Sequence, residues 1–137
     1  MGSAASLFVT KAAYADWPAN AFDAKKVPDA LQRLFGQDTL IDSTDITLTI
    51  TDWAENGSVV PVTVTSTLAN IESISLMVDK NPNALVARFN LVKNTKAFIK
   101  TNIKMAETSN VIAIVKVGDK LYSARKKVKV TLNGCGN

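Results

Sequence analysis

The sequence has no histidine and only one cysteine among its 137 residues. Without histidine, the Ser-His and Cys-His pairs of nucleophilic catalysis cannot form, and the commonest ligand of zinc and copper is missing. A single cysteine builds neither an internal disulfide nor a cysteine-rich metal site. These absences remove most of the chemistry that side chains perform by themselves, so we expect no metal and no other cofactor.

Long apolar runs and a strong charge bias are absent too. No run approaches the roughly 18 to 20 apolar residues of a membrane-spanning helix, and the net charge is only +4. A pI near 9.3 weakly favours anionic partners and does not by itself indicate nucleic acid. We expect one domain with a single core, and neither a nucleic-acid nor a membrane partner.

The first third of the sequence favours helix. Residues 1–20 form an alanine-rich segment whose start, Met1-Gly2-Ser3, is typical of recombinant expression. A clearer helix is predicted over residues 28–35, because Pro28 suits the first helical position and Gly36 suits the C-terminal cap. Its core-facing side should hold Val27, Leu31, Leu34 and Phe35.

From residue 45 onward the periodicity changes to two, which is typical of half-buried strands. Ile46, Leu48 and Ile50 alternate with threonines. After a tight turn at Gly118-Asp119, residues 121–132 form one long strand, or two joined by a bulge near residues 125–127. Further strands are predicted over residues 60–65 (with Pro61 near an edge or strand start), 71–78, 85–92, 98–105 and 111–117. About seven strands at such spacing predict a β-sandwich.

No repeat, low-complexity tract or linker interrupts this pattern. The helical N-terminal segment should pack across the sandwich or reach to a partner. The predicted parts of the chain are a helical, partly expression-derived segment (residues 1–20), the sandwich domain with its leading helix (residues 21–132) and a flexible tail (residues 133–137).

The single cysteine lies third from the end of the chain. Cys135 is flanked by Gly134 and Gly136, and Asn133 and Asn137 bound the tail. Glycine offers no side chain to pack, and chain ends are usually mobile, so an accessible thiol is favoured over a buried small hydrophobe. A prenyl anchor is not predicted, because prenylation needs a cysteine fourth from the end and that position is Gly134. Because a catalytic cysteine needs a fixed base, the tail is better suited to a carrier than to an enzyme.

Basic residues precede this tail on the last predicted strand. By alternation, Arg125, Lys127 and Lys129 share one face. A solvated strand face is the simpler interpretation, and the alternative is a basic patch that steers anions or acidic partners. The opposite face should point to the core and holds Val128, Val130 and Leu132.

Six short stretches occur in a characteristic order. They are ITLT (46–49), AENGSVVPV (54–62), KNPNAL (80–85), KM (104–105), SNV (109–111) and KVKVTL (127–132). With the terminal Gly-Cys-Gly, they resemble the SoxY family, the sulfur-carrying subunits of the SoxYZ complex in thiosulfate oxidation. The resemblance covers about residues 21–137. The family's tail is usually Gly-Gly-Cys-Gly-Gly; here Asn133 and Asn137, which still tolerate positive φ, replace the outer glycines.

The resemblance implies a periplasmic protein with an immunoglobulin-like sandwich, whose native signal peptide has been removed. Cys135 would hold sulfur intermediates covalently while other Sox proteins act on them, which makes the protein a carrier and not an enzyme. SoxAX would join thiosulfate oxidatively to the thiol, SoxB would hydrolyse off sulfate, and a sulfane dehydrogenase would oxidise the remaining sulfur. SoxZ would be the partner subunit of a heterodimer.

Two other functions stay open on the residues alone. A structural or adhesion-type sandwich would use its terminal cysteine to form a disulfide-linked dimer. A thiol enzyme, such as a peroxidase or sulfurtransferase, would turn over unaided, although the chain lacks histidine and a resolving cysteine. The surface that meets a partner subunit is also open, with the N-terminal helical segment and the strand around residues 59–64 as candidates.

Overall fold

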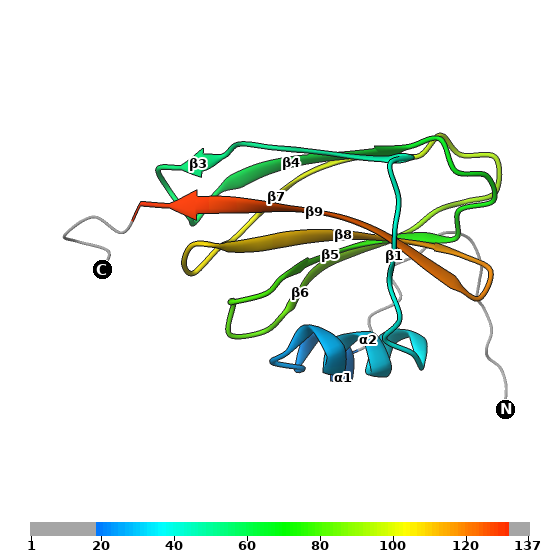
Figure 1. Ribbon diagram of the computed structural model, residues 1–137, viewed down its shortest axis with the longest axis horizontal. Helices are drawn as coiled ribbons and strands as arrows, with labels where there is room; N and C mark the ends of the chain where they lie inside the picture. Colours follow the sequence, from blue (N-terminus) through cyan, green and yellow to red (C-terminus); the bar gives the residue numbers. More distant parts are fainter. Residues whose placement is uncertain (1–18, 132–137) are drawn as a thin grey trace, which may run out of the picture.

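The computed structural model describes residues 19–131, and it places two β-sheets face to face with two helices outside one of them (Figure 1). The predicted β-sandwich with a leading helical segment is confirmed. The helices are α1 (Ala19–Phe22) and α2 (Val27–Phe35). The strands are β1 (Ile41–Asp42), β2 (Ile46–Ile50), β3 (Trp53–Ala54), β4 (Val60–Ser66), β5 (Ser73–Val78), β6 (Leu85–Asn90), β7 (Phe98–Ile103), β8 (Ser109–Val117) and β9 (Lys120–Val130).

The strands divide unequally between the sheets. The larger sheet has the order β1-β9-β8-β5-β6, with β3 also paired to β9, and the smaller sheet has the order β2-β4-β7. Among the described residues, seven strands are longer than two residues, and all pairs between these seven are antiparallel. Four of the seven strands therefore face three across the core, which is the immunoglobulin-like architecture that the resemblance implies.

Helix α2 forms where the sequence predicts it. Pro28 lies in its first turn, and Gly36 ends the helix at φ 73°, donating its N–H to the Gln32 carbonyl at 2.8 Å. Arg33 and Asp29, one turn apart, form an exposed ion pair at 3.0 Å. The predicted apolar face packs on the larger sheet through Val27 and Leu31, which are buried, and Leu34 and Phe35, which are partly buried.

Two apolar layers hold the molecule together. The first lies between the sheets and includes Leu76, Val115 and Val128. The second lies between the helices and the outer side of the larger sheet, where Met77 and Ile114 are fully buried. A strand covered on both sides is not amphipathic, and all six residues of β5 are buried for that reason, although its sequence suggested simple alternation.

Strand β9 is one continuous strand. Its antiparallel register with β8 runs unbroken from the pair Ser109 and Val128 to the pair Val117 and Lys120, so the alternative of a bulge near residues 125–127 is wrong. The bulge of this sheet lies instead between Leu76 and Met77, opposite β6. Since alternation in β9 never slips, each of its residues keeps a defined face from one end of the sandwich to the other.

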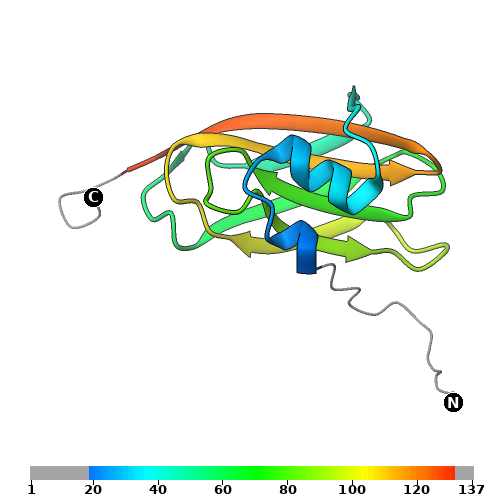
Figure 2. The same ribbon diagram turned by 90° about the horizontal axis from the view of Figure 1, so that it is seen from below.

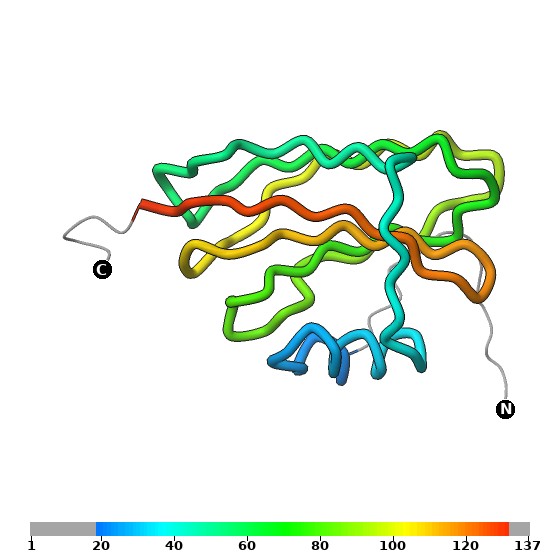
Figure 3. The backbone as a smooth tube through the Cα atoms, viewed as in Figure 1, coloured from blue at the N-terminus to red at the C-terminus, as the bar shows by residue number. Residues whose placement is uncertain are grey.

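Between α2 and β4 the chain pairs with the larger sheet at β1, enters the smaller sheet at β2, pairs with the larger sheet again at β3 and returns to the smaller sheet at β4. Figure 3 shows its rise from the helices to the layer of the smaller sheet. On this path β1 and β3 add two short parallel pairings to the free edge of β9. The sequence did not indicate either, because a two-residue strand has no periodicity. Such short strands cover backbone groups that would otherwise be exposed at a sheet edge. Pro61, the second residue of β4, lies one position beyond Val62, the last residue of β4 that pairs with β2, so no partner on that side requires its missing N–H.

Candidate functional site

The end of β9 is the part of the described structure that leads into the predicted carrier tail. Three backbone N–H groups hydrogen-bond this end of β9 to neighbouring segments. Lys129 donates to the Asp52 carbonyl at 2.9 Å, Thr131 donates to the Ala54 carbonyl at 3.0 Å, and Val130 donates to the Thr108 hydroxyl at 3.0 Å. The chain is therefore fixed by hydrogen bonds as far as Thr131, the last described residue.

Trp53 adds a side-chain contact to this anchored end. Its indole Nε1–H donates to the Thr131 hydroxyl, although 63% of the Trp53 surface is exposed. The Thr51 hydroxyl holds the Trp53 backbone from the other side, since it accepts from the Trp53 N–H at 3.2 Å and donates to the Trp53 carbonyl at 3.0 Å. The sequence alone does not indicate a role for Trp53, because a single tryptophan in a two-residue strand carries no pattern.

Gly57 packs closely against the end of β9. A methyl group at Gly57 would overlap the Met105 carbonyl oxygen and lie 3.0 Å from Val130 Cγ1. The approach is close because the Met105 N–H donates to the Gly57 carbonyl at 2.7 Å. The β3–β4 and β7–β8 connections thus meet over the buried Val130, and glycine is required at that contact.

The basic residues of β9 lie where alternation predicts them. Arg125, Lys127 and Lys129 are exposed at every second position, while Val128 and Val130 are buried against the core. Among residues 19–131, none of the three basic side chains forms an ion pair. We call these three residues the basic row.

Lys126, on the other face of β9, shows a contrasting arrangement. Its ammonium group lies 3.1 Å from the Asp52 carboxylate and donates to the Ile50 carbonyl at 2.8 Å. Its charge is therefore used within the fold. The parallel register places Trp53 next to Lys129, so the exposed indole continues the basic row toward Thr131.

The residues predicted to carry the chemistry lie outside the described residues. These are Cys135, its neighbours Gly134 and Gly136, and the bounding Asn133 and Asn137; the core-facing prediction for Leu132 and the helical prediction for residues 1–18 lie outside them as well. The structure brings together only the elements that lead to Cys135. The role of Cys135 stays a prediction from the sequence.

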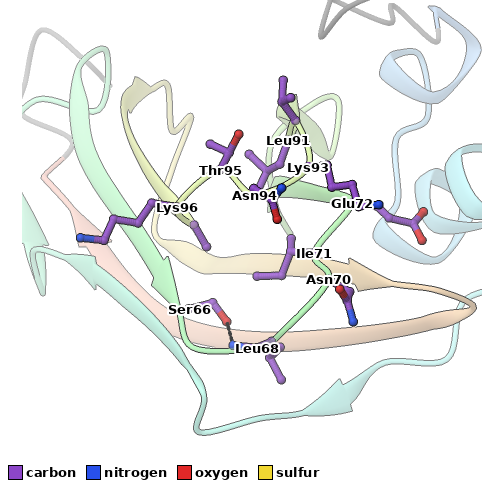
Figure 4. Close-up of a pocket in the computed structure, with 12 residues that line it drawn as sticks. Ser66, Leu68, Asn70, Ile71, Glu72, Leu91, Lys93, Asn94, Thr95 and Lys96 are labelled. Carbon is purple, nitrogen blue, oxygen red and sulfur yellow. Dashed lines mark hydrogen bonds between the residues drawn. The ribbon is translucent and has the colours of Figure 1, made fainter.

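A cavity of about 610 Å³ lies at the opposite end of the sandwich, between the β4–β5 and β6–β7 connections (Figure 4). Asn70 and Asn94, both at positive φ, help to line it. At its rim, Glu72 accepts from Lys116 at 2.8 Å and from the Gly118 N–H at 3.0 Å. The Lys116 hydrogen bond, with help from Gly118, lowers the pKa of the Glu72 carboxyl despite some desolvation.

This cavity is remote from the end of β9. The Gly118 contact places it beside the turn where β9 begins, and β9 then runs eleven residues to Val130. Such a strand is about 35 Å long, and in Figure 1 the β8–β9 turn and the end of β9 lie at opposite ends. A smaller hollow of about 410 Å³ is lined by residues of the β5–β6 turn and the end of β7.

Within residues 19–131 no cluster of acidic, histidine or cysteine side chains suited to a metal ion occurs, and no helix is long and apolar enough to cross a membrane. What the end of β9 offers is a fixed strand end, an exposed tryptophan and the three cations of the basic row, which have no ion-pair partner within residues 19–131. This arrangement can position a segment and attract negative charge.

Comparison with known proteins identifies the family of this chain. The family model described as sulfur oxidation protein SoxY matches residues 31–135. The solved sulfur carrier protein SoxY from Chlorobium limicola f thiosulfatophilum is 36% identical, with a TM-score of 0.71, and covers 84% of this chain and 100% of its own. A chain in a structure on T cell specificity and activation by the bacterial superantigen toxic shock syndrome toxin-1 shares 12% identity at a TM-score of 0.44, over 62% of this chain and 100% of its own. No curated protein matches.

Proposed function

The chain belongs to the SoxY family of sulfur oxidation proteins, and we propose that it carries the sulfur intermediates of thiosulfate oxidation as covalent adducts of Cys135. The family match extends to Cys135 itself, and the solved relative from Chlorobium is a sulfur carrier protein. The observation that supports the role most directly is that the matched region ends in the chain's only thiol, four residues after an anchored strand end.

The chemistry requires only a thiol on this chain. In the loading step the Cys135 sulfur forms a bond to the outer sulfur of thiosulfate, giving Cys–S–S–SO₃⁻. The thiol proton is released, and two electrons pass to the conjugating enzyme, for which the proposed partner is SoxAX. Hydrolysis by SoxB would then add water, release sulfate and one proton, and leave a persulfide, Cys–S–SH, at Cys135. Each bond-making step takes place in the partner's site.

The anchored strand end suits such a carrier. Hydrogen bonds fix the backbone as far as Thr131, and the four Cα–Cα steps from there to Cys135 extend to about 14 Å. A sulfur on this swinging arm can enter a pocket on another protein while the sandwich stays outside. The remote 610 Å³ cavity lies beyond this reach, so we assign it no part in carrying sulfur.

Negative charge accompanies every stage of this proposal. Thiosulfate is a dianion, its adduct ends in a sulfonate, and a persulfide ionises readily. The basic row, Arg125, Lys127 and Lys129, places three positive charges, unpaired within residues 19–131, on the strand that leads to the cysteine. Such charges raise the local concentration of anionic species and of acidic partner surfaces.

The proposed assembly follows the family. SoxZ is the proposed partner subunit in a heterodimer, SoxAX, SoxB and a sulfane dehydrogenase are the proposed transient partners, and the periplasm is the proposed compartment. The protein would be a substrate of these enzymes and not an enzyme itself. Strand β4, which the sequence suggested for the subunit contact, is the central strand of the smaller sheet, so only its outward side chains could take part.

A loading assay tests the proposal. The purified protein is incubated with thiosulfate and the conjugating enzyme, and its intact mass is measured before and after a reductant. We expect a reductant-labile gain of one thiosulfonate group that maps to Cys135. Cys135→Ser should keep the fold and gain no mass. If the serine variant were loaded, or if wild-type protein turned thiosulfate over without an enzyme, the carrier function would be wrong.

A further inference from the structure

The outer face of the larger sheet is only partly covered. The helices pack over β5, β6 and the half of β8 and β9 that contains Ile114 and Leu121. In Figure 2, where the helices lie in front of this sheet, β9 runs along the upper margin of the view beyond them. The uncovered half of β9 carries the basic row and ends beside Trp53. Here an exposed aromatic and the three cations of the row form one continuous surface.

This surface is longer than a single small anion. Arg125 and Lys129 are four residues apart on a strand, or about 13 Å, with Lys127 between them. A single sulfur oxyanion can lie between two neighbouring members of the row, about 7 Å apart, but it does not span the whole row. A protein surface with carboxylates at similar spacing contacts all three together. The row therefore complements an extended acidic surface better than it complements a free ion.

Trp53 points to the same kind of partner. Its side chain is 63% exposed although its Nε1–H is already bonded to Thr131, so what it still presents is mainly apolar ring surface. An apolar ring contributes little to the binding of a small anion. In protein interfaces, however, tryptophan and arginine are among the residues most enriched at the energetically dominant positions.

We propose that the basic row and Trp53 form a docking surface for an acidic surface of the enzyme that conjugates thiosulfate to Cys135. This inference rests on the proposed carrier function, because it names the partner of the same site. A partner held against β9 and Trp53 lies next to Thr131, and its catalytic pocket then falls within the roughly 14 Å that the arm spans. Docking on the rigid strand positions the enzyme, and the arm delivers the sulfur.

The test compares two matched triple variants. Arg125→Gln, Lys127→Gln and Lys129→Gln together neutralise the basic row. Lys93→Gln, Lys96→Gln and Lys100→Gln remove the same charge from positions outside this surface. Thermal unfolding followed by circular dichroism verifies that both variants fold. The rate of Cys135 loading by the conjugating enzyme is then measured over a range of ionic strengths.

We expect kcat/KM for loading to fall about tenfold or more in the row variant at low salt, and the difference to shrink as salt rises. kcat at saturation should stay within about twofold, because the row takes no part in the chemistry. The control variant should follow the wild type. Equal kcat/KM values for the two triple variants at low salt would overturn the docking surface.

Two further measurements separate enzyme docking from the steering of small anions, and separate both from a failure of the carrier function. The reaction of the isolated protein with the dianionic reagent dithiobis(nitrobenzoate) reports steering of small anions. If its rate falls as much as the enzymatic rate, the row serves small anions and the inference is wrong. Binding of the enzyme to Cys135→Ser, with and without the row, reports docking without the thiol. Row-dependent binding would support the docking surface even if loading failed, and failed loading would refute only the carrier function.

Trp53→Ala supplies a test that involves no charge. Phe98→Ala is the matched control, since Phe98 is an exposed aromatic on the smaller sheet. We expect Trp53→Ala to weaken enzyme binding to Cys135→Ser at all salt concentrations, and Phe98→Ala to leave it unchanged. Equal binding by both variants would remove Trp53 from the docking surface.

Discussion

Replacing Gly57 by alanine should loosen the anchored end of β9. The added methyl group would overlap the Met105 carbonyl oxygen and press on Val130 Cγ1 at 3.0 Å. Both neighbours are constrained, since one is backbone and the other is a buried valine. The β3–β4 connection must therefore move, and it would lose the 2.7 Å hydrogen bond from the Met105 N–H to the Gly57 carbonyl.

The magnitude follows from these two effects. Overpacking a well-packed site costs about 1–3 kcal/mol, and the lost hydrogen bond costs about 1 kcal/mol. We expect Gly57→Ala to lower the free energy of unfolding by about 2–4 kcal/mol. At about 4 °C per kcal/mol for a domain of this size, Tm should fall by about 8–16 °C.

Thermal unfolding measures the loss, and hydrogen exchange locates it. The amide protons of Val130 and Thr131 should exchange faster in Gly57→Ala, because the end of β9 is released first. Gly118→Ala is the control, since nothing lies within 4 Å of an added methyl group and only the positive φ opposes it, at a cost of about 1 kcal/mol. A loss below about 1 kcal/mol for Gly57→Ala, with unchanged exchange at Val130, would refute the packing argument.

Three further outcomes are expected. Leu76→Ala removes a fully buried side chain between the sheets and should lower the free energy of unfolding by about 2–5 kcal/mol in denaturant titrations. Trp53→Phe removes the indole donor to Thr131 but keeps an apolar ring, so it should cost no more than about 1 kcal/mol and speed exchange of the Thr131 amide; unchanged exchange would mean that the indole bond contributes nothing to the anchor. The lowered pKa of Glu72 means that its folded form binds a proton less readily than the unfolded chain does. Its contribution is thus present above the unfolded pKa and lost as pH falls through the lower, folded one. Glu72→Gln should therefore remove a small part of the stability near pH 7 and very little in acid, once the Glu72 carboxyl is protonated in the folded protein too. We expect a loss of less than about 1 kcal/mol, because more than half of the Glu72 side chain is exposed; an equal loss at neutral and acid pH would contradict the assignment.

The sequence predicts the regular elements well because their periodicity is long. The helix over residues 28–35 has a proline at its start and a glycine in the left-handed conformation after its end, and both are local signals. The alternation in β9 places Arg125, Lys127 and Lys129 on one face without knowledge of any neighbour. Such patterns need only the chain itself.

The remaining features depend on contacts between distant segments. Strands β1 and β3 exist because the chain crosses beside β9, and the two-sided burial of β5 exists because α1 and α2 cover the sheet. Gly57 resembled any turn glycine, and only its approach to Met105 shows why a side chain is excluded there. Trp53 gained a role only when its pairing with Lys129 and its bond to Thr131 were known.

The most direct test of the central claim is the intact mass of the protein isolated from cells that are oxidising thiosulfate, measured with and without reductant. The carrier function predicts reductant-labile adducts of sulfane or thiosulfonate mass, all on Cys135. A bare thiol, or a disulfide-linked dimer without sulfur adducts, in such cells would contradict it and would favour a cross-linking role for the terminal cysteine.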